Sequence, residues 1–232
     1  SGIADFHFAP TEQAKKNLLK EGIRKNVWVV GNTVVDAVGL GMKRVRRQGI
    51  GLNEARFGSL LRGKRLVLVT VHRRENLGHP LEDICRAIKD LAIADETLHF
   101  ILPVHPNPGV RNVVFRMLEC VPSVTLIDPL DYPALLSLMA KSKIILTDSG
   151  GIQEEAPSFG VPVLVMRRVT ERTEGLVAGI AELVGTDRNK IVRAARKHLR
   201  SARHPRARRE NPYGDGKTSE RISSILRSVL RS

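Results

Sequence analysis

Cysteine and aromatic residues are scarce in this chain of 232 residues, which holds two cysteines and only 4% Phe, Trp and Tyr. So few cysteines exclude the disulfide framework of a small secreted domain. Cys85 and Cys120 both fall on apolar faces of predicted helices, so we expect buried free thiols in a reducing compartment. The chain is therefore predicted to be cytoplasmic.

Long apolar runs and a signal peptide are also missing. No stretch approaches the roughly 20 apolar residues that cross a bilayer, and no secretory signal opens the chain. Hydrophobic residues make up 42% and charged residues 27% of the sequence, as in soluble globular proteins. The length allows one large domain, or one domain plus a fragment.

Acidic residues are fewer than basic ones. The chain has 24 Asp and Glu against 38 Lys and Arg, which gives a net charge of +14. Much of the excess lies between Arg188 and Arg209. Such a run can bind nucleic acid through phosphates, but its apolar residues recur at helical spacing, which also predicts a helix with a solvated basic face. No aromatic residue interleaves with the run, so we expect no nucleic-acid partner.

Strand and helix patterns alternate along most of the chain. Short apolar runs predict eight strands, at Phe6–Ala9, Val27–Val30, Leu66–Val71, His99–Val104, Val124–Ile127, Ile144–Leu146, Val163–Met166 and Ala181–Val184. Near-continuous apolar strands separated by helices predict an α/β fold, a Rossmann-like parallel sheet with helices on both faces. In such sheets ligands bind beyond the carboxyl ends of the strands.

The first 40 residues do not fit this alternation cleanly, and its regular part begins at Arg65. We interpret residues 1–33 as the last strand–helix pair of a truncated N-terminal domain, plus a linker. Residues 34–210 are then one Rossmann-like domain that binds the ligand, and residues 211–232 form a C-terminal loop and helix.

The turn at Ser149, Gly150 and Gly151 is the strongest candidate for a ligand site. It joins an apolar strand to a helical pattern, and free backbone N–H groups at a helix start attract anions. The Ser149 hydroxyl adds a donor, and Glu154 or Glu155 can accept hydrogen bonds from ribose hydroxyls. The alternative is an ordinary connection with Ser149 as the N-cap.

Two histidines follow neighbouring strands. His72 is flanked by Arg73 and Arg74, a combination that suits a phosphorylated ligand. His105 lies in a loop stiffened by prolines. The alternative for His72 is a polar loop with a hydrogen bond to the backbone, and a lone histidine such as His105 is more often structural. Matching positions at two strand ends nevertheless favour a functional role for both.

A third polar segment, Arg167–Glu174, follows another strand and offers arginines for the same anion, although alternating charges are also typical of a solvated loop. The histidines lack the spacing of metal ligands. Ser149 lacks the glycine-flanked elbow of a serine nucleophile. We therefore expect neither a metal site nor a serine hydrolase.

Several motifs together resemble one family, the non-hydrolysing UDP-N-acetylglucosamine 2-epimerases. The matching segments are His72–Asn76, His105–Pro108, Asp148–Pro157, Thr170–Arg172 and Asn211–Gly216. The resemblance covers nearly the whole chain and implies the C-terminal half of a two-domain fold of the glycosyltransferase-B type. It implies an isomerase of polysaccharide biosynthesis that interconverts UDP-N-acetylglucosamine and UDP-N-acetylmannosamine by eliminating and re-adding UDP, without a cofactor.

The resemblance also implies roles for single residues. Ser149, Gly150 and Gly151 would hold the diphosphate, with Arg172 on a phosphate and Glu155 on the ribose. Further residues in family positions are Leu135 near the uracil, His72 at the functionally important histidine, and Arg73 with His105 at a possible allosteric UDP-sugar site.

The chain departs from the family at its N-terminus, where members continue further and carry the carboxylates that move the C2 proton. Acid–base work at C2 needs such groups within hydrogen-bond reach. We therefore expect this chain alone to be inactive, and its protein partner to be a second copy or an N-terminal half. A glycosyltransferase and a non-catalytic UDP-sugar-binding domain remain alternatives.

Overall fold

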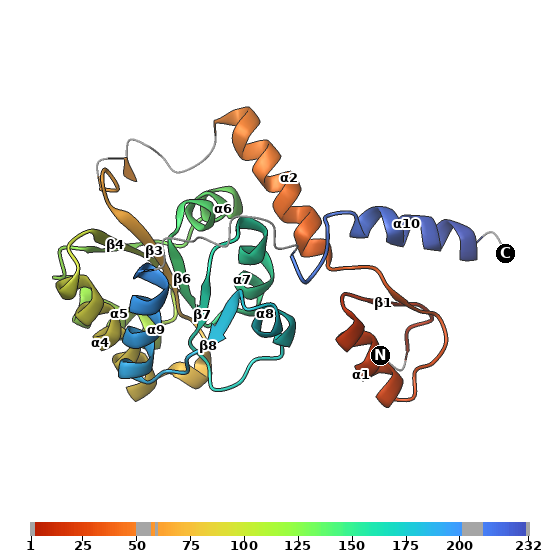
Figure 1. Ribbon diagram of the computed structural model, residues 1–232, viewed down its shortest axis with the longest axis horizontal. Coiled ribbons are helices and arrows are strands. Elements are labelled where there is room, and N and C mark those ends of the chain that lie inside the picture. The colour runs from red at the N-terminus through yellow and green to blue at the C-terminus, as the bar shows by residue number, and fades with distance from the viewer. Residues whose placement is uncertain (1–2, 50–56, 59, 201–210, 231–232) are drawn as a thin grey trace.

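The computed structural model describes residues 3–49, 57–58, 60–200 and 211–230 (Figure 1). Within this part the main sheet has six parallel strands, which are β3 (Arg65–Thr70), β4 (Leu98–Pro103), β5 (Val124–Ile127), β6 (Ile144–Thr147), β7 (Val163–Val165) and β8 (Ala181–Leu183). Every residue of β6 and β7 is buried, as are all but one each of β3 and β4. Strands buried this completely must be apolar on both faces.

The order of the strands across the sheet is β5-β4-β3-β6-β7-β8. After β3 the chain places β4 and β5 on one side of it, and then returns to place β6 on the other side. The order reverses between β3 and β6, and ligands bind at such a reversal, beyond the carboxyl ends of the strands. His72 follows β3 and Ser149 follows β6, so the topology brings these two segments together.

Helices cover both faces of this sheet (Figure 1). They are α2 (Thr33–Gln48), α4 (His79–Ala94), α5 (Pro108–Leu118), α6 (Tyr132–Lys141), α7 (Gly150–Glu155) and α9 (Arg188–Arg200). α4, α5 and α9 share one hydrophobic core with Val67 and Val69, whereas α2, α6 and α7 share another with Leu66 and Leu68. Alternate side chains of β3 therefore enter opposite cores, and the predicted α/β architecture is confirmed.

The predicted strands agree with the structure. All eight are present, and no boundary is displaced by more than one residue. Leu81, Ile84 and Ile88 of α4 are each at most 1% exposed, as their helical spacing predicts. Packing rather than intrinsic propensity fixes these elements, because each apolar run has a core to enter.

The prediction for the cysteines is half wrong. Cys85 is buried, and this burial raises the pKa of its thiol to about 12. Cys120 is exposed, because α5 ends at Leu118 and the apolar face of that helix does not extend to it. Both residues are free thiols.

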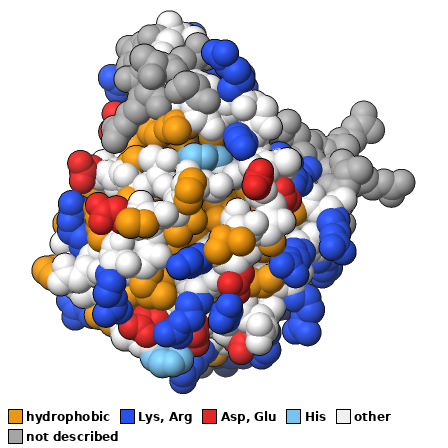
Figure 2. Space-filling view, turned by 90° about the vertical axis from the view of Figure 1, so that its left-hand side faces the viewer, with side chains coloured by type: hydrophobic (Ala, Val, Ile, Leu, Met, Phe, Trp, Pro, Cys, Tyr) orange, Lys and Arg blue, Asp and Glu red, His pale blue; other side chains and the backbone are white. Residues whose placement is uncertain are grey.

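The basic run forms a solvated helix face where the structure describes it. In α9 the buried residues are Ile191, Ala194, Ala195 and Leu199. Arg188 at the helix start is paired with Asp90, with an Nε–Oδ2 distance of 2.5 Å. On the side of the molecule seen in Figure 2, basic side chains are interspersed with acidic and apolar ones. Residues 201–209 of the run lie outside the described residues.

The remaining elements include a second, small sheet. They are β1 (His7–Ala9), α1 (Glu12–Lys20), β2 (Val27–Val29), the 3-10 helices η1 (Arg74–Asn76) and η2 (Ala156–Phe159), α8 (Thr173–Val177) and α10 (Thr218–Val229). β1 and β2 pair in parallel, separate from the main sheet, and α1 buries none of its residues (Figure 1). The Thr11 hydroxyl donates to Glu174 at 2.5 Å and so ties this unit to α8. The domain boundaries at residues 33 and 210 stay predictions.

Candidate functional site

A cavity of about 330 Å³ lies at the carboxyl ends of β3, β4 and β6. Its wall includes His72 after β3, His105 after β4, and Ser149 with Gly151 after β6. Another side is closed by Pro129 and Leu130, between β5 and α6, and by Tyr132 and Leu135 of α6. The cavity therefore joins a polar wall at the strand ends to an apolar wall, a combination that is typical of small-molecule sites.

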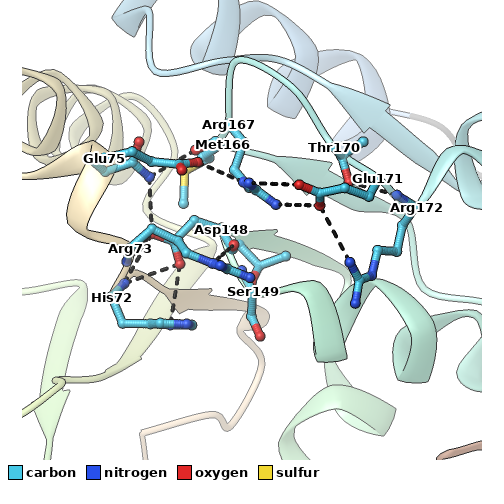
Figure 3. A network of polar contacts seen from close by, with 12 residues as sticks. His72, Arg73, Glu75, Asp148, Ser149, Met166, Arg167, Thr170, Glu171 and Arg172 are labelled. Atoms are coloured by element: carbon cyan, nitrogen blue, oxygen red, sulfur yellow. Dashed lines mark hydrogen bonds and ion pairs between the residues drawn. The ribbon is translucent and has the colours of Figure 1, made fainter. Parts of the chain in front are cut away.

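Asp148 organises the polar wall although it does not line the cavity. It is 0% exposed, and its carboxylate accepts hydrogen bonds from the backbone N–H of His72 and of Arg73, and from the Asn76 side chain, at 2.9 to 3.1 Å (Figure 3). Its Oδ1 lies 3.3 Å from Nδ1 of His72. A buried carboxylate needs such donors. Asp148 was only part of a motif in the sequence. Its position, directly after a buried strand and before the glycine turn, was the available signal.

The two predicted histidines lie side by side. The rings of His72 and His105 are stacked, with 5.8 Å between centroids and 26° between planes. Nδ1 of His105 accepts the backbone N–H of Asn107 at 3.1 Å. Each histidine thus has a structural contact, and both line the cavity. The prediction that strand ends bring them together is confirmed.

The glycine turn begins α7 as expected. Ser149 occupies the N-cap position, but its hydroxyl makes no capping hydrogen bond. A Cβ built on Gly150 would lie 3.3 Å from Cζ of Arg172, so that guanidinium rests against the helix start. A Cβ built on Gly151 would meet only Ser149 Oγ, at 3.9 Å. Ser149 is therefore the N-cap residue of α7, as the alternative interpretation expected. Its hydroxyl, however, does not cap the helix, so capping does not explain why a serine stands here.

A chain of ion pairs links the loops around the cavity (Figure 3). Arg172 contacts Glu154 at 3.0 Å and Glu171 at 3.4 Å. Arg167, whose side chain is 5% exposed, contacts Glu75 at 2.7 Å and Glu171 at 3.1 Å. Both arginines are thus paired with two carboxylates, but the guanidinium of Arg172 also lies against Gly150 at the glycine turn. Their neighbour Arg168 is exposed.

Glu155 and Tyr132 form a partly buried pair at the cavity wall. Burial raises the pKa of Glu155, although the hydrogen bond from Tyr132 opposes that shift. Burial and the adjacent Glu155 carboxylate raise the pKa of Tyr132. Tyr132 therefore stays a hydrogen-bond donor, and Glu155 is an acceptor that ionises with difficulty.

Replacing Glu155 by glutamine should make unfolding less dependent on pH. The folded protein binds the Glu155 proton more tightly than the unfolded chain does, so stability is lost as pH rises through the raised pKa. Relative to the wild type, Glu155→Gln should gain stability from near pH 4.5, the ordinary pKa of this carboxyl, upward. Urea unfolding at several pH values measures the difference. A difference that does not change with pH would contradict the assignment.

Among the described residues, no group of three or more His, Cys, Asp and Glu side chains is placed to hold a metal ion. In the same part of the chain, no helix has both the length and the apolar character needed to cross a membrane.

Comparison with known proteins places the chain in a family. The family model described as UDP-N-acetylglucosamine 2-epimerase matches residues 1–227. The chain belongs to the UDP-N-acetylglucosamine 2-epimerase family. It is 43% identical over 235 residues to the UDP-N-acetylglucosamine 2-epimerase of Escherichia coli K12, covering 97% of this chain and 61% of that protein. The chain spans about 60% of the length of the curated relatives that it matches.

Solved structures of 2-epimerases share the fold. MnaA of S. aureus with UDP superimposes with a TM-score of 0.90 at 42% identity, over 99% of this chain and 62% of that one. The Neisseria meningitidis UDP-GlcNAc 2-epimerase bound to UDP-GlcNAc gives 0.88 at 39% identity, over 97% and 62%. A UDP-forming trehalose-phosphate synthase from Burkholderia vietnamiensis, 11% identical, shares the fold alone with a TM-score of 0.59, over 96% and 61%. The predicted glycosyltransferase-B type of fold is thereby confirmed.

Proposed function

We propose that this chain supplies the UDP-binding part of an epimerase that interconverts UDP-N-acetylglucosamine and UDP-N-acetylmannosamine. The observation that carries the proposal is the cavity at the reversal of strand order, which His72 and the Ser149 turn line together. That site belongs to a chain of the 2-epimerase family. Two of its structural relatives hold UDP or UDP-GlcNAc.

The diphosphate would lie against the start of α7. Gly150 and Gly151 present backbone N–H groups there, and the absence of a Cβ lets phosphate approach the main chain. The guanidinium of Arg172 lies beside Gly150 and adds a charged donor. The Ser149 hydroxyl, which caps nothing, is a further donor. Local geometry and charge thus favour an anion at this turn.

The nucleoside would occupy the opposite side of the cavity. Glu155 can accept a ribose hydroxyl, and Leu135 lies in the apolar wall where a uracil ring would be shielded from water. His72 would face the diphosphate end. The exposed His105 lines the cavity, and the half-buried Arg73 follows His72 in the chain; we assign these two residues to a second, allosteric UDP-sugar.

We also propose that these 232 residues bind the nucleotide sugar without epimerising it. Among the described residues, Glu155 is the one acidic side chain that lines the cavity, and it is hydrogen-bonded to Tyr132. Proton removal and return at C2 need acid and base groups within hydrogen-bond reach. Those groups would come from another polypeptide segment or a second copy. The unburied helix α1 is a surface on which such a partner can pack.

The proposal is tested by incubating the chain with UDP-N-acetylglucosamine in D₂O. We expect calorimetry to detect UDP binding, and proton NMR to show neither deuterium at C2 nor UDP-N-acetylmannosamine. Failure to bind UDP would overturn the proposed function. Turnover by a monomeric 232-residue chain would instead show that the acid and base lie within it. UDP release that depends on an added sugar acceptor would indicate a glycosyltransferase.

A further inference from the structure

The side-chain hydrogen bonds of Asp148 all go to the segment that begins at His72. Its carboxylate is 0% exposed, so it does not contact a ligand in the cavity. Its two oxygens receive N–H groups from His72, Arg73 and Asn76, which belong to the segment after β3. Asp148 itself follows β6, on the other side of the reversal of strand order. One buried side chain therefore connects the two segments that form the site.

The same carboxylate selects one nitrogen of the imidazole. Nδ1 of His72 lies 3.3 Å from Asp148 Oδ1 (Figure 3). All the hydrogen-bonding neighbours of Asp148 just named are N–H donors, so its oxygens act as acceptors. A neutral imidazole carries one proton, and an acceptor beside Nδ1 favours the tautomer with that proton on Nδ1. Nε2, on the far side of the ring, then carries no proton in the neutral form and is the nitrogen that can gain one.

The remaining contacts hold the ring in place. The His72 main chain is fixed by its N–H bond to Asp148, and the ring stacks on His105 at 5.8 Å between centroids. His105 is in turn held by the Asn107 backbone N–H. The position of the His72 ring is thus set before a ligand arrives, as preorganised sites require.

We propose that Asp148 is a positioning residue. It keeps His72 protonated at Nδ1 and presents Nε2 to the diphosphate, where Nε2 donates a hydrogen bond when it is protonated. The inference rests on the proposed function for the identity of the ligand. The tautomer of His72 in the free protein does not depend on it.

The first test is the ¹⁵N NMR spectrum of the imidazoles in the free wild-type chain. We expect neutral His72 to have its proton on Nδ1, whereas free histidine prefers Nε2. UDP should shift the Nε2 resonance of His72 more than the Nδ1 resonance. A His72 with its proton on Nε2 in the free protein would overturn the proposal. If the Nδ1 tautomer is found but calorimetry detects no UDP binding, the proposed function fails and the positioning of the ring stands.

The second test asks whether Asp148 acts through His72. Asp148→Asn and His72→Ala should each weaken UDP binding about tenfold, the loss typical of one charge-assisted hydrogen bond. The double variant should lose no more than either single variant, because residues that act as a unit are not additive. Losses that multiply would contradict the proposal.

A control variant separates positioning from support of the loop. Asn76→Ala removes another buried partner of Asp148 and should lower the melting temperature while leaving the imidazole contact in place. We expect the Nδ1 tautomer to persist in Asn76→Ala and to be lost in Asp148→Asn. Equal loss of the tautomer in both variants would reduce Asp148 to a structural anchor and contradict the proposal. If Asp148→Asn does not fold, the wild-type tautomer still decides.

Discussion

Gly151→Val should abolish UDP binding and leave the fold intact. Gly151 is exposed on the cavity wall, and the helix positions around it have ordinary backbone angles. A Cβ at this site would meet only Ser149 Oγ, at 3.9 Å, so the protein has room for a side chain. Valine is also a better helix former than glycine. Its branched side chain would occupy the space through which a phosphate reaches the backbone N–H groups.

The matched control is Gly39→Val, in α2. Gly39 is also an exposed helical glycine, and a Cβ built there meets nothing within 4 Å. Calorimetry should show unchanged UDP affinity for Gly39→Val and no measurable binding for Gly151→Val, with similar melting temperatures for both. Unchanged affinity in Gly151→Val would mean that the diphosphate binds elsewhere.

Arg172→Met should weaken UDP binding by about 30-fold or more, since truncating one partner of a hydrogen-bonded charge pair costs roughly 2 kcal/mol or more. The guanidinium lies against Gly150, and Glu154 and Glu171 fix its position. Methionine keeps most of the length of the side chain but removes the charge. The loss should be larger for UDP than for uridine, because only UDP carries the phosphates.

Arg168→Met is the control for the change in net charge. Arg168 is a nearby exposed arginine and does not line the cavity. Its replacement should alter UDP affinity little at physiological salt, because exposed charges are screened over about 8 Å under those conditions. If the two variants lose affinity equally, attraction of the anion by the net positive charge of the protein explains binding. Arg172 then has no special role.

The elements of the fold could be predicted from the sequence because their signals are local. β6 is buried on both faces, so Ile144, Ile145 and Leu146 form a continuous apolar run. The Gly150–Gly151 turn and the histidines follow such runs directly, which made their neighbourhood predictable. Strand ends of a parallel sheet lie at one edge, and therefore His72 and His105 meet.

Long-range pairing could not be predicted in the same way. Arg167 and Glu75 are 92 positions apart, and nothing near either residue indicates its partner. The environment of Asp148 depends on β3 and β6 being neighbours, which alternation alone does not specify. Cys120 was misplaced because an apolar pattern shows a helix face more reliably than it shows the last turn of the helix.

The most direct measurement is a titration of the ¹⁵N-labelled chain with UDP, followed by backbone amide NMR. We expect saturable shifts that are largest at Gly150, Gly151 and Ile152, where the diphosphate meets the start of α7. Shifts centred on the basic face of α9, or no saturable shift at the glycine turn, would contradict binding at this site.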